Sequence, residues 1–547
     1  SGENKTPYGP FRDAMNAYLR IFKRYDPERQ REIRDSIREK TGDLGELLLR
    51  LNPLMKEILG ECPPLVELEP DRENKRFLMV VSGFFTGLSA VEGSLVILLD
   101  DLHWTDRGTV ELLDEILQEI AKFPLMIIGT FRGSEVGEGH PLRAFVDATV
   151  KYPVPPQVIE LDQLGGDDIR RLVAGILFQE EDAMDDIAEF IARKGQGNPF
   201  FSIEILKQMV RDGALEHRKK RWMMNGDTLS RLEISSSVVD IVMKRIAQLE
   251  QRDMEVLSYA AALGRQFDAG LLFRLMDSCP KEGVVDAVDR ALALQLIEES
   301  DGDPNVLVFS HDRIRDAFDR MIDAGESAAI HGKIAETLEE MHGDNPDAVS
   351  YELVHHTIKS GNRDKTLVYA IPAGRKARES YANEEAIRYF SLARAILEER
   401  GMEGGPPWVE CQEGIGEVYL LIGKSDEAIE IFTTLLKYKK TPVEQALVYK
   451  NITEAYFKMG NFIKCEENGR KGLAILGEKL PVRTADVLIG MVKELAVHAV
   501  HGFSAFLGRK IREKNFEQKY RIIALFYKSL MWMYVFTDVV KMARSQL

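Results

Sequence analysis

Ser94-Leu-Val-Ile-Leu-Leu-Asp-Asp-Leu-His-Trp-Thr-Asp106 is the stretch that decides the fold, and we call it the strand-end segment. Its apolar run is continuous rather than alternating, which is typical of a parallel strand covered on both faces. Asp100 and Asp101 follow the run at the carboxyl end of the strand, where open α/β sheets bind ligands. The segment therefore predicts either a site for Mg²⁺, which prefers hard anionic oxygens, or a core strand with an acidic helix cap.

A second apolar run, Pro124-Leu-Met-Ile-Ile-Gly-Thr-Phe-Arg132, favours the first interpretation. An amphipathic helix over Val110–Ala121 connects the two runs, so we expect them to be neighbouring strands. The second strand would then deliver Thr130 and Arg132 close to the carboxylates. In a nucleotide hydrolase, a polar residue and a cation here sense the γ-phosphate and stabilise developing charge. A surface ion pair is the alternative for Arg132.

The flanking sequence predicts helices and one more strand. Helical periodicity runs over Arg12–Leu59, with breaks near Gly42 and Pro53, and again over Arg72–Leu88. Val158–Leu161 resembles a short strand. Further helices are expected over Asp167–Phe178, Asp182–Arg193 and Ser202–Asp212. The tight turn Gly197-Asn198-Pro199 precedes the last of these, either as a plain helix cap or as backbone that lies against a base or phosphate.

Three motifs together resemble a known family. The order and spacing of these motifs resemble the STAND class of P-loop NTPases, which are signal-transduction ATPases related to AAA+ proteins. The motifs are Leu98–Asp106, Ile128–Arg132 and Gly197–Phe201. The similarity is greatest to bacterial multidomain regulators that carry a kinase or cyclase domain, and to the corresponding region of soluble adenylyl cyclases.

The resemblance implies ATP or ADP and Mg²⁺ as ligands and assigns roles to individual residues. Asp100 would belong to the Mg²⁺ shell of a Walker B motif, and Asp101 would be the catalytic, water-orienting base. Arg132 would be the sensor arginine, with Thr130 beside the nucleotide. Gly197, Asn198 and Pro199 would form the GxP motif next to the nucleotide. His103 and Trp104 also match the family pattern, with roles in packing and loop shape.

The region 229–325 predicts short helices and a two-stranded wing. Leu296–Glu298 and Val306–Phe309 flank Asp301-Gly-Asp-Pro304, a strong turn signal. The family resemblance implies a winged-helix domain here, in which His311 approaches the β-phosphate of ADP. A helix cap or a packed side chain is the alternative for His311.

Beyond Gly325 the pattern is helix after helix. Two segments align with each other at a shift of 37 residues. The aligned positions are Tyr419, Gly423, Ala428 and Phe432 in the first, and Tyr456, Gly460, Cys465 and Gly469 in the second. This spacing resembles tetratricopeptide repeats, whose period is about 34 residues. Such α-solenoids present extended surfaces to protein partners or to an effector domain.

A phosphate-cradling loop is missing, because no GxxxxGK[ST] occurs in the sequence. The Gly-Lys-Ser at Gly423–Ser425 is expected in a repeat turn. We expect that the chain is an internal piece of a larger protein whose Walker A loop lies upstream and whose repeats continue; a degenerate pseudo-ATPase is the alternative. Either way, we predict weak or no ATPase activity for these 547 residues.

Composition limits the partners. Lys and Arg number 72 and Asp and Glu 88, a net charge of −16, which argues against a general nucleic-acid or anionic-membrane surface. The apolar run Ile522–Val540 is interrupted by Lys528 and Asp538, so we expect a repeat helix rather than a membrane span. Four widely spaced cysteines and no secretion signal favour a reducing cytoplasm.

The sequence thus predicts an α/β fold, a partial STAND nucleotide-binding domain with a parallel sheet, followed by a winged helix and an α-solenoid. The expected domains are a partial ATPase over 1–165, a helical lid with the GxP motif over 166–228, the winged helix over 229–325 and repeats over 326–547. The expected function is a nucleotide-dependent switch that regulates an attached effector, with nucleotide-dependent oligomerisation as a further expectation. A non-catalytic repeat scaffold with a vestigial nucleotide fold and a DNA-binding transcription regulator are the alternatives.

Overall fold

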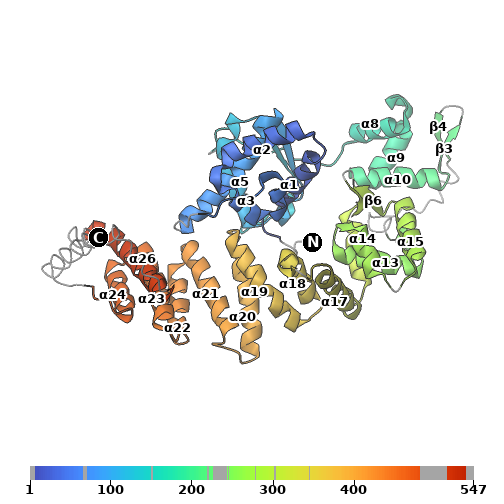
Figure 1. Cartoon of the computed structure of the whole chain (residues 1–547). Coiled ribbons are helices and arrows are strands. Elements are labelled where there is room, and N and C mark those ends of the chain that lie inside the picture. Colours follow the sequence, from blue (N-terminus) through green and yellow to red (C-terminus); the bar gives the residue numbers. More distant parts are fainter. Residues whose placement is uncertain are drawn as a thin grey trace. The chain divides into compact units, whose positions relative to one another are not determined.

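The strand-end segment forms a parallel sheet, as predicted. In the computed structural model of the protein (Figure 1), β1 (Leu95–Leu99) pairs with β2 (Leu125–Gly129) in parallel, from Leu95 opposite Leu125 to Leu99 opposite Gly129. Helix α6 (Arg107–Glu119) connects the two strands, and α5 (Pro70–Glu92) leads into β1. Both strands therefore end at the same edge of the sheet, which brings their carboxyl-terminal residues together.

The structure describes most of the chain, and its contacts divide the chain into two compact units. The described residues are 6–65, 70–148, 152–218, 221–225, 243, 245–277, 279–300, 303–343, 345–480 and 514–537. The first unit comprises Ser1–Val154, His342–Ile358 and Asn362–Leu547, and the second comprises Pro155–Met341 and Lys359–Gly361. The domain boundaries at residues 165, 228 and 325 stay predictions.

Within the part of the chain that the structure describes, only one face of the parallel sheet is covered, so the expectation of a strand buried on both faces was wrong. Ile97 and Leu99 of β1 lie in the core, against helices of the first unit. On the other face Val96 is 60% exposed, Leu98 64%, Met126 57% and Ile128 40%. A continuous apolar run indicates that both faces are apolar, but it does not show that the described part of the chain covers both.

The N-terminal helices follow the predicted pattern. They are α1 (Gly9–Phe22), α2 (Pro27–Thr41), α3 (Glu46–Leu51) and α4 (Lys56–Leu59). The predicted breaks are confirmed, because Gly42 adopts a φ of 55° after α2 and Asn52-Pro53 separates α3 from α4. The buried faces of these helices share one core with α5, α6 and β1.

The strand predicted at Val158–Leu161 was wrong. The segment forms no strand with any described residue, and Val158, Ile159 and Leu161 are exposed. Pro155 and Pro156 lie just before it, separated from Val158 by Gln157, and lack the N–H groups that a paired strand donates. Three apolar residues in a short segment are therefore not enough to make a strand here.

Three helices and a hairpin open the second unit. The helices are α8 (Gly166–Leu177), α9 (Asp185–Gly195) and α10 (Pro199–Arg211). Helix α10 begins at Pro199 and not at Ser202 as expected, because proline is well accommodated in the first turn. The antiparallel hairpin of β3 (Leu215–Arg218) and β4 (Arg221–Met224) was missed, since its polar residues give no clear strand pattern.

A three-stranded antiparallel sheet follows in the same unit, in the order β5-β7-β6. The predicted hairpin is confirmed as β6 (Ile297–Ser300) and β7 (Asp303–Phe309), with β5 (Gln266–Asp268) on the other edge of β7. The surrounding helices are α13 (Gln251–Leu263), α14 (Ala269–Leu275), α15 (Lys281–Ala293), α16 (Asp312–Met321) and α17 (Ala324–Met341). Asp301 and Gly302 of the predicted turn, and the predicted helical start at 229–242, lie outside the described residues.

Helical repeats complete the first unit and follow one another as packed neighbours (Figure 1). They are α18 (Ser350–Lys359), α19 (Arg363–Glu379), α20 (Asn383–Glu399), α21 (Pro406–Leu421), α22 (Ser425–Leu435), α23 (Pro442–Lys458), α24 (Phe462–Ile475) and α26 (Lys514–Thr537). The 37-residue match is confirmed as equivalent positions, because Gly423 and Gly460 adopt φ values of 79° and 70° in corresponding turns.

Within the described residues, no helix combines the length and the apolar character that crossing a membrane requires. The end of the apolar run Ile522–Val540 lies outside these residues. All four cysteines are free thiols.

Candidate functional site

Thr130 connects the ends of the two parallel strands. Its backbone N–H donates to the carbonyl of Leu99 at 3.0 Å, which continues the strand pairing by one residue. Its hydroxyl donates to Oδ1 of Asp100 and accepts from the backbone N–H of Asp101 at 3.0 Å. The structure therefore brings Asp100, Asp101 and Thr130 together as predicted, with the Asp100 carboxylate held at the sheet edge.

Asp101 has a left-handed backbone, with φ 56° and ψ 44°. This conformation costs a non-glycine residue on the order of 1 kcal/mol, and aspartate is among the residues that tolerate it best. The chain thereby turns into the short 3₁₀ helix Leu102–Trp104, and the Leu102 N–H donates to the Thr130 carbonyl at 2.8 Å.

His103 links the two strand ends, a role that the sequence analysis missed. Its fully buried ring accepts a hydrogen bond at Nδ1 from the backbone N–H of Arg132, at 3.4 Å. In the neutral ring, Nε2 therefore carries the proton. Nε2 lies 3.8 Å from Oδ1 of Asp101 and 3.4 Å from Oε2 of Glu135. His103 thus faces two carboxylates with its N–H, and only its position after the Asp pair in the sequence hints at this.

Arg132 lies at the predicted strand end and makes an ion pair with a neighbour. Its Nη1 is 3.0 Å from Oε1 of Glu135, and both side chains are substantially exposed. Such a pair adds little stability, so it corresponds to the surface ion pair that was the alternative for this residue. The predicted sensor role of Arg132 stays a prediction.

Asp106 closes the strand-end segment and was not among the predicted site residues. It caps α6 by accepting from the Thr109 N–H at 3.0 Å and from the Thr109 hydroxyl at 2.6 Å. It also accepts from the backbone N–H of Tyr8 at 3.1 Å. The buried Asp106 carboxylate therefore fixes both the start of α6 and the N-terminal entry of the chain.

The Gly197–Pro199 turn belongs to the second unit, where it serves as a helix cap. Gly197 has a φ of 72°, and a Cβ at this position would lie 2.7 Å from the carbonyl oxygen of Leu164. Oδ1 of Asn198 accepts from the Phe201 N–H at 2.9 Å, and Pro199 is the first residue of α10. These contacts explain all three residue types structurally, and contact with a nucleotide stays a prediction.

His311 is also a helix cap, at the start of α16. Its Nδ1 accepts from the backbone N–H of Arg313 at 3.0 Å, so Nε2 carries the proton of the neutral ring. Its ring lies 4.7 Å from the ring of Phe200, the residue that follows Pro199. The second unit therefore brings two predicted site elements, the Gly-Asn-Pro turn and His311, close to each other.

The residues at the sheet edge fit a magnesium ion better than a whole nucleotide. Asp100 offers carboxylate oxygens, the ligands that Mg²⁺ prefers, and Thr130 orients one of them. The triphosphate needs backbone amides and a lysine, and the only Gly-Lys-Ser lies in the turn between α21 and α22, as expected. The chain thus offers carboxylate oxygens at the sheet edge, and its sequence contains no GxxxxGK[ST].

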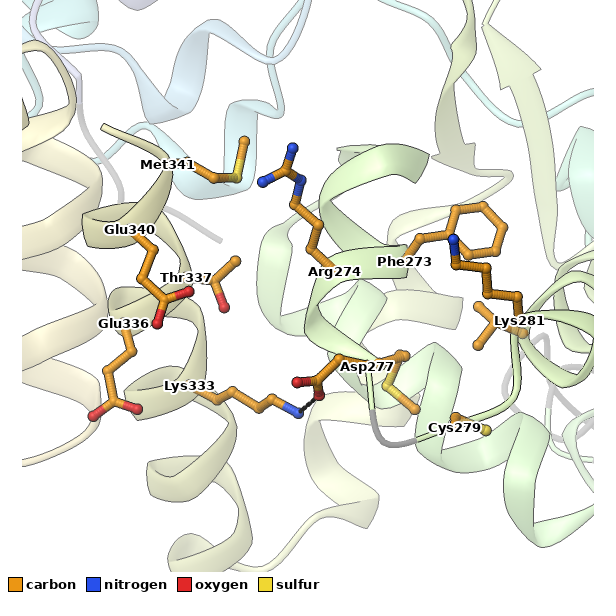
Figure 2. Close-up of a pocket in the computed structure, with 12 residues that line it drawn as sticks. Phe273, Arg274, Asp277, Cys279, Lys281, Lys333, Glu336, Thr337, Glu340 and Met341 are labelled. Atoms are coloured by element: carbon orange, nitrogen blue, oxygen red, sulfur yellow. Dashed lines mark hydrogen bonds and ion pairs between the residues drawn. The ribbon is translucent and has the colours of Figure 1, made fainter. Parts of the chain in front are cut away.

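A cavity of about 590 Å³ in the second unit contains none of the predicted site residues. Figure 2 shows its two walls, one from α17 and the other from α14 and the segment leading into α15, with Lys333 of α17 paired to Asp277 at 2.9 Å. The positive and negative side chains that line the cavity are equal in number. They are the cations Arg274, Lys281 and Lys333 and the carboxylates Asp277, Glu336 and Glu340. Because the charges cancel, the cavity does not select a ligand of either sign, and we do not place the site there.

Comparisons with known proteins give similarities but no family. No family model matches the chain. An uncharacterized protein of Rhizobium meliloti (strain 1021) is 22% identical over 303 residues, which are 55% of this chain and 28% of that protein. The crystal structure of a STAND protein with a tetratricopeptide repeat sensor from Pyrococcus horikoshii is 13% identical, with a TM-score of 0.31, over 89% of this chain and 79% of that chain. The chain thus spans little more than a quarter of the curated relative, and its similarity to these proteins does not assign it to a family.

Proposed function

We propose that this chain is the Walker B half of a nucleotide-dependent signal-transduction switch, together with its winged-helix and repeat regions. The observation that carries the proposal is the Thr130 hydroxyl bonded to Asp100 and to the N–H of Asp101 at the ends of two parallel strands. This arrangement places hard oxygen ligands at the sheet edge where α/β folds bind nucleotides.

Each residue has a separate role in this proposal. Asp100 holds Mg²⁺, which when bound neutralises phosphate charge. Asp101 orients the attacking water, and the N–H of His103, 3.8 Å away, steadies its carboxylate. Arg132 stabilises charge that develops on the phosphate. Gly197, Asn198, Pro199 and His311 also contact the nucleotide in this proposal, and His311 donates from Nε2.

The proposal requires a phosphate-binding loop from polypeptide outside these 547 residues, because their sequence contains no GxxxxGK[ST]. The chain alone therefore binds Mg·ADP or Mg·ATP weakly and does not turn ATP over. In the whole protein, ADP favours a closed state and ATP an open one. The helical repeats receive a protein signal, and an attached effector reads the change.

Calorimetric titration of the chain with Mg·ADP tests the metal site. We expect weak, magnesium-dependent heat that disappears in Asp100→Asn and persists in Glu138→Gln, an exposed carboxylate in the loop after β2. Binding that is the same in both variants would show that Asp100 is not the metal ligand. Robust ATP turnover by the chain, abolished by Asp100→Ala, would overturn the need for an external loop.

A non-catalytic repeat scaffold is the second candidate, and the missing phosphate loop is the observation that favours it. The encoding reading frame separates the two candidates. A GxxxxGK[ST] about 100 residues upstream, the length of a few strand–helix units, supports the switch. A start codon at this boundary supports the scaffold.

A further inference from the structure

The first helices of the repeats pack directly on the helices that flank β1. The Tyr381 hydroxyl, between α19 and α20, donates to Oε2 of Glu73 in α5 at 3.0 Å. The Tyr381 ring lies 5.3 Å from the ring of Phe77, also in α5. At the start of α20, Oε1 of Glu384 is 3.7 Å from Nη1 of Arg107, the first residue of α6. A displacement of α20 therefore acts on the strand-end segment without an intervening domain.

Two buried carboxylates are the sequence neighbours of this ion pair, Asp106 next to Arg107 and Glu385 next to Glu384. Asp106 is 4% exposed and Glu385 is 6% exposed. Asp106 receives hydrogen bonds from the Tyr8 N–H and from the N–H and hydroxyl of Thr109. Two buried carboxylates that influence each other cannot both ionise without cost. A buried carboxyl group next to a carboxylate is more easily protonated, and we assign the proton to Glu385.

The surroundings of Glu385 support this assignment. Burial, and then the charge of Asp106, raise the pKa of Glu385 to about 7. Arg388, one turn further along α20, opposes the rise, and it is also engaged with the Tyr389 ring and hydroxyl. The titratable and charged groups that face Glu385 or its neighbour Glu384 are Tyr8, Asp106, Arg107, Tyr351, Arg388 and Tyr389.

We propose that Asp106 and Glu385 form a proton-dependent contact through which the repeats hold the strand-end segment, closed when Glu385 is protonated and loosened when it ionises. Asp106 caps α6 and binds the Tyr8 amide, so loosening at Glu385 reaches the start of α6 and the N-terminal entry together. The contact needs no nucleotide and goes beyond the proposed switch, because it gives the repeats a direct route to the predicted Mg²⁺ residues.

The direction of the pH effect follows from linkage. A carboxyl group with a raised pKa in the closed state contributes stability that is complete below its ordinary value of 4.5. That contribution is lost as the pH rises through about 7. Between about pH 6 and about pH 8, the equilibrium for opening the contact should therefore increase roughly tenfold.

Hydrogen exchange measured by mass spectrometry tests this on the full chain. The readout is the protection factor, corrected for intrinsic exchange, of peptides that cover the first turns of α6 and α20. We expect the wild-type protection to fall roughly tenfold over this pH range. Glu385→Gln, which mimics the protonated form, should remove the pH dependence. Glu384→Gln is the matched control on the same turn and should retain the wild-type dependence.

Wild-type protection that does not change with pH, or a Glu385→Gln variant that keeps the tenfold change, would overturn the proposal. If Glu385→Gln does not fold, Asp106→Asn replaces it. Asparagine can still cap α6, and loss of the neighbouring charge should shrink the pH-dependent change. An unchanged profile in Asp106→Asn would also overturn the proposal. Because no nucleotide is added, this result is independent of the calorimetric test of Asp100.

Discussion

The backbone N–H of Tyr8 donates to Oδ2 of Asp106 at 3.1 Å, across 98 residues of sequence. Tyr8 has a φ of 55°, and its fully buried ring lies against Gly108 in the first turn of α6. One carboxylate thus connects the entry of the chain, the start of α6 and the segment that carries Asp100 and Asp101. This junction allows predictions about stability that do not depend on the proposed function.

Asp106→Ala should destabilise the first unit by about 1–3 kcal/mol, because it removes a helix cap and leaves the Tyr8 N–H buried without its acceptor. Asp106→Asn should cost less, since asparagine is an equally good cap. Thermal unfolding at about pH 6 is the suitable measurement, because Glu385, with a pKa of about 7, is then mostly protonated. Equal losses in the two variants would contradict the capping role.

Gly108→Ala should destabilise the same junction by about 1–3 kcal/mol through overpacking. A Cβ at Gly108 would lie 2.7 Å from Cζ of Tyr8, which cannot move freely in the core. Gly137→Ala is the control, since a Cβ there meets nothing within 4 Å. The comparison uses the midpoint of chemical denaturation, and an unchanged midpoint in Gly108→Ala would show that the ring can shift aside.

Thr130→Val should weaken the magnesium-dependent binding of ADP, because it removes the hydroxyl that orients Asp100 and accepts from the Asp101 N–H. The loss of stability should stay near about 1 kcal/mol, since the site is exposed to water. Thr130→Ser keeps the hydroxyl and should bind like the wild type. If calorimetry gives the same ADP affinity for Thr130→Val and Thr130→Ser, the Thr130 hydroxyl does not orient the metal ligand.

Gly414→Ala should destabilise the repeats by about 1–3 kcal/mol. The Phe390 ring of α20 packs between two glycines, and a Cβ at Gly414 of α21 would lie 2.5 Å from its Cε2. Gly175→Ala in α8 is a control of the opposite sign, since its Cβ meets nothing within 4 Å and alanine favours the helix by up to about 1 kcal/mol. Circular dichroism during heating distinguishes the two outcomes.

The sequence predicted those parts of the fold whose signals are local. The runs at Leu95–Leu99 and Leu125–Gly129 became parallel strands, and the turn signal before Val306 became a hairpin. Val158–Leu161 shows the limit, because an apolar run becomes a strand only when another strand pairs with it. The uncovered face of β1 and β2 was also beyond prediction, since apolar composition does not reveal what packs against it.

The same division applies to the candidate site. Asp100 and Thr130 could be paired from the sequence because each directly follows a strand, and parallel strands end at a common edge. His103, Asp106 and Glu385 act through contacts that depend on how distant segments pack. Their roles therefore required the structure.

The uncovered face of the parallel sheet has a consequence for experiments on the chain. This face is an apolar surface on a folded unit, formed by Val96, Leu98, Met126 and Ile128. Dyes such as ANS, whose fluorescence usually reports a molten globule, should bind this surface while near-ultraviolet circular dichroism stays native. Dye fluorescence would then measure how completely this face is covered, and any polypeptide that completes the sheet should quench it by displacing the dye.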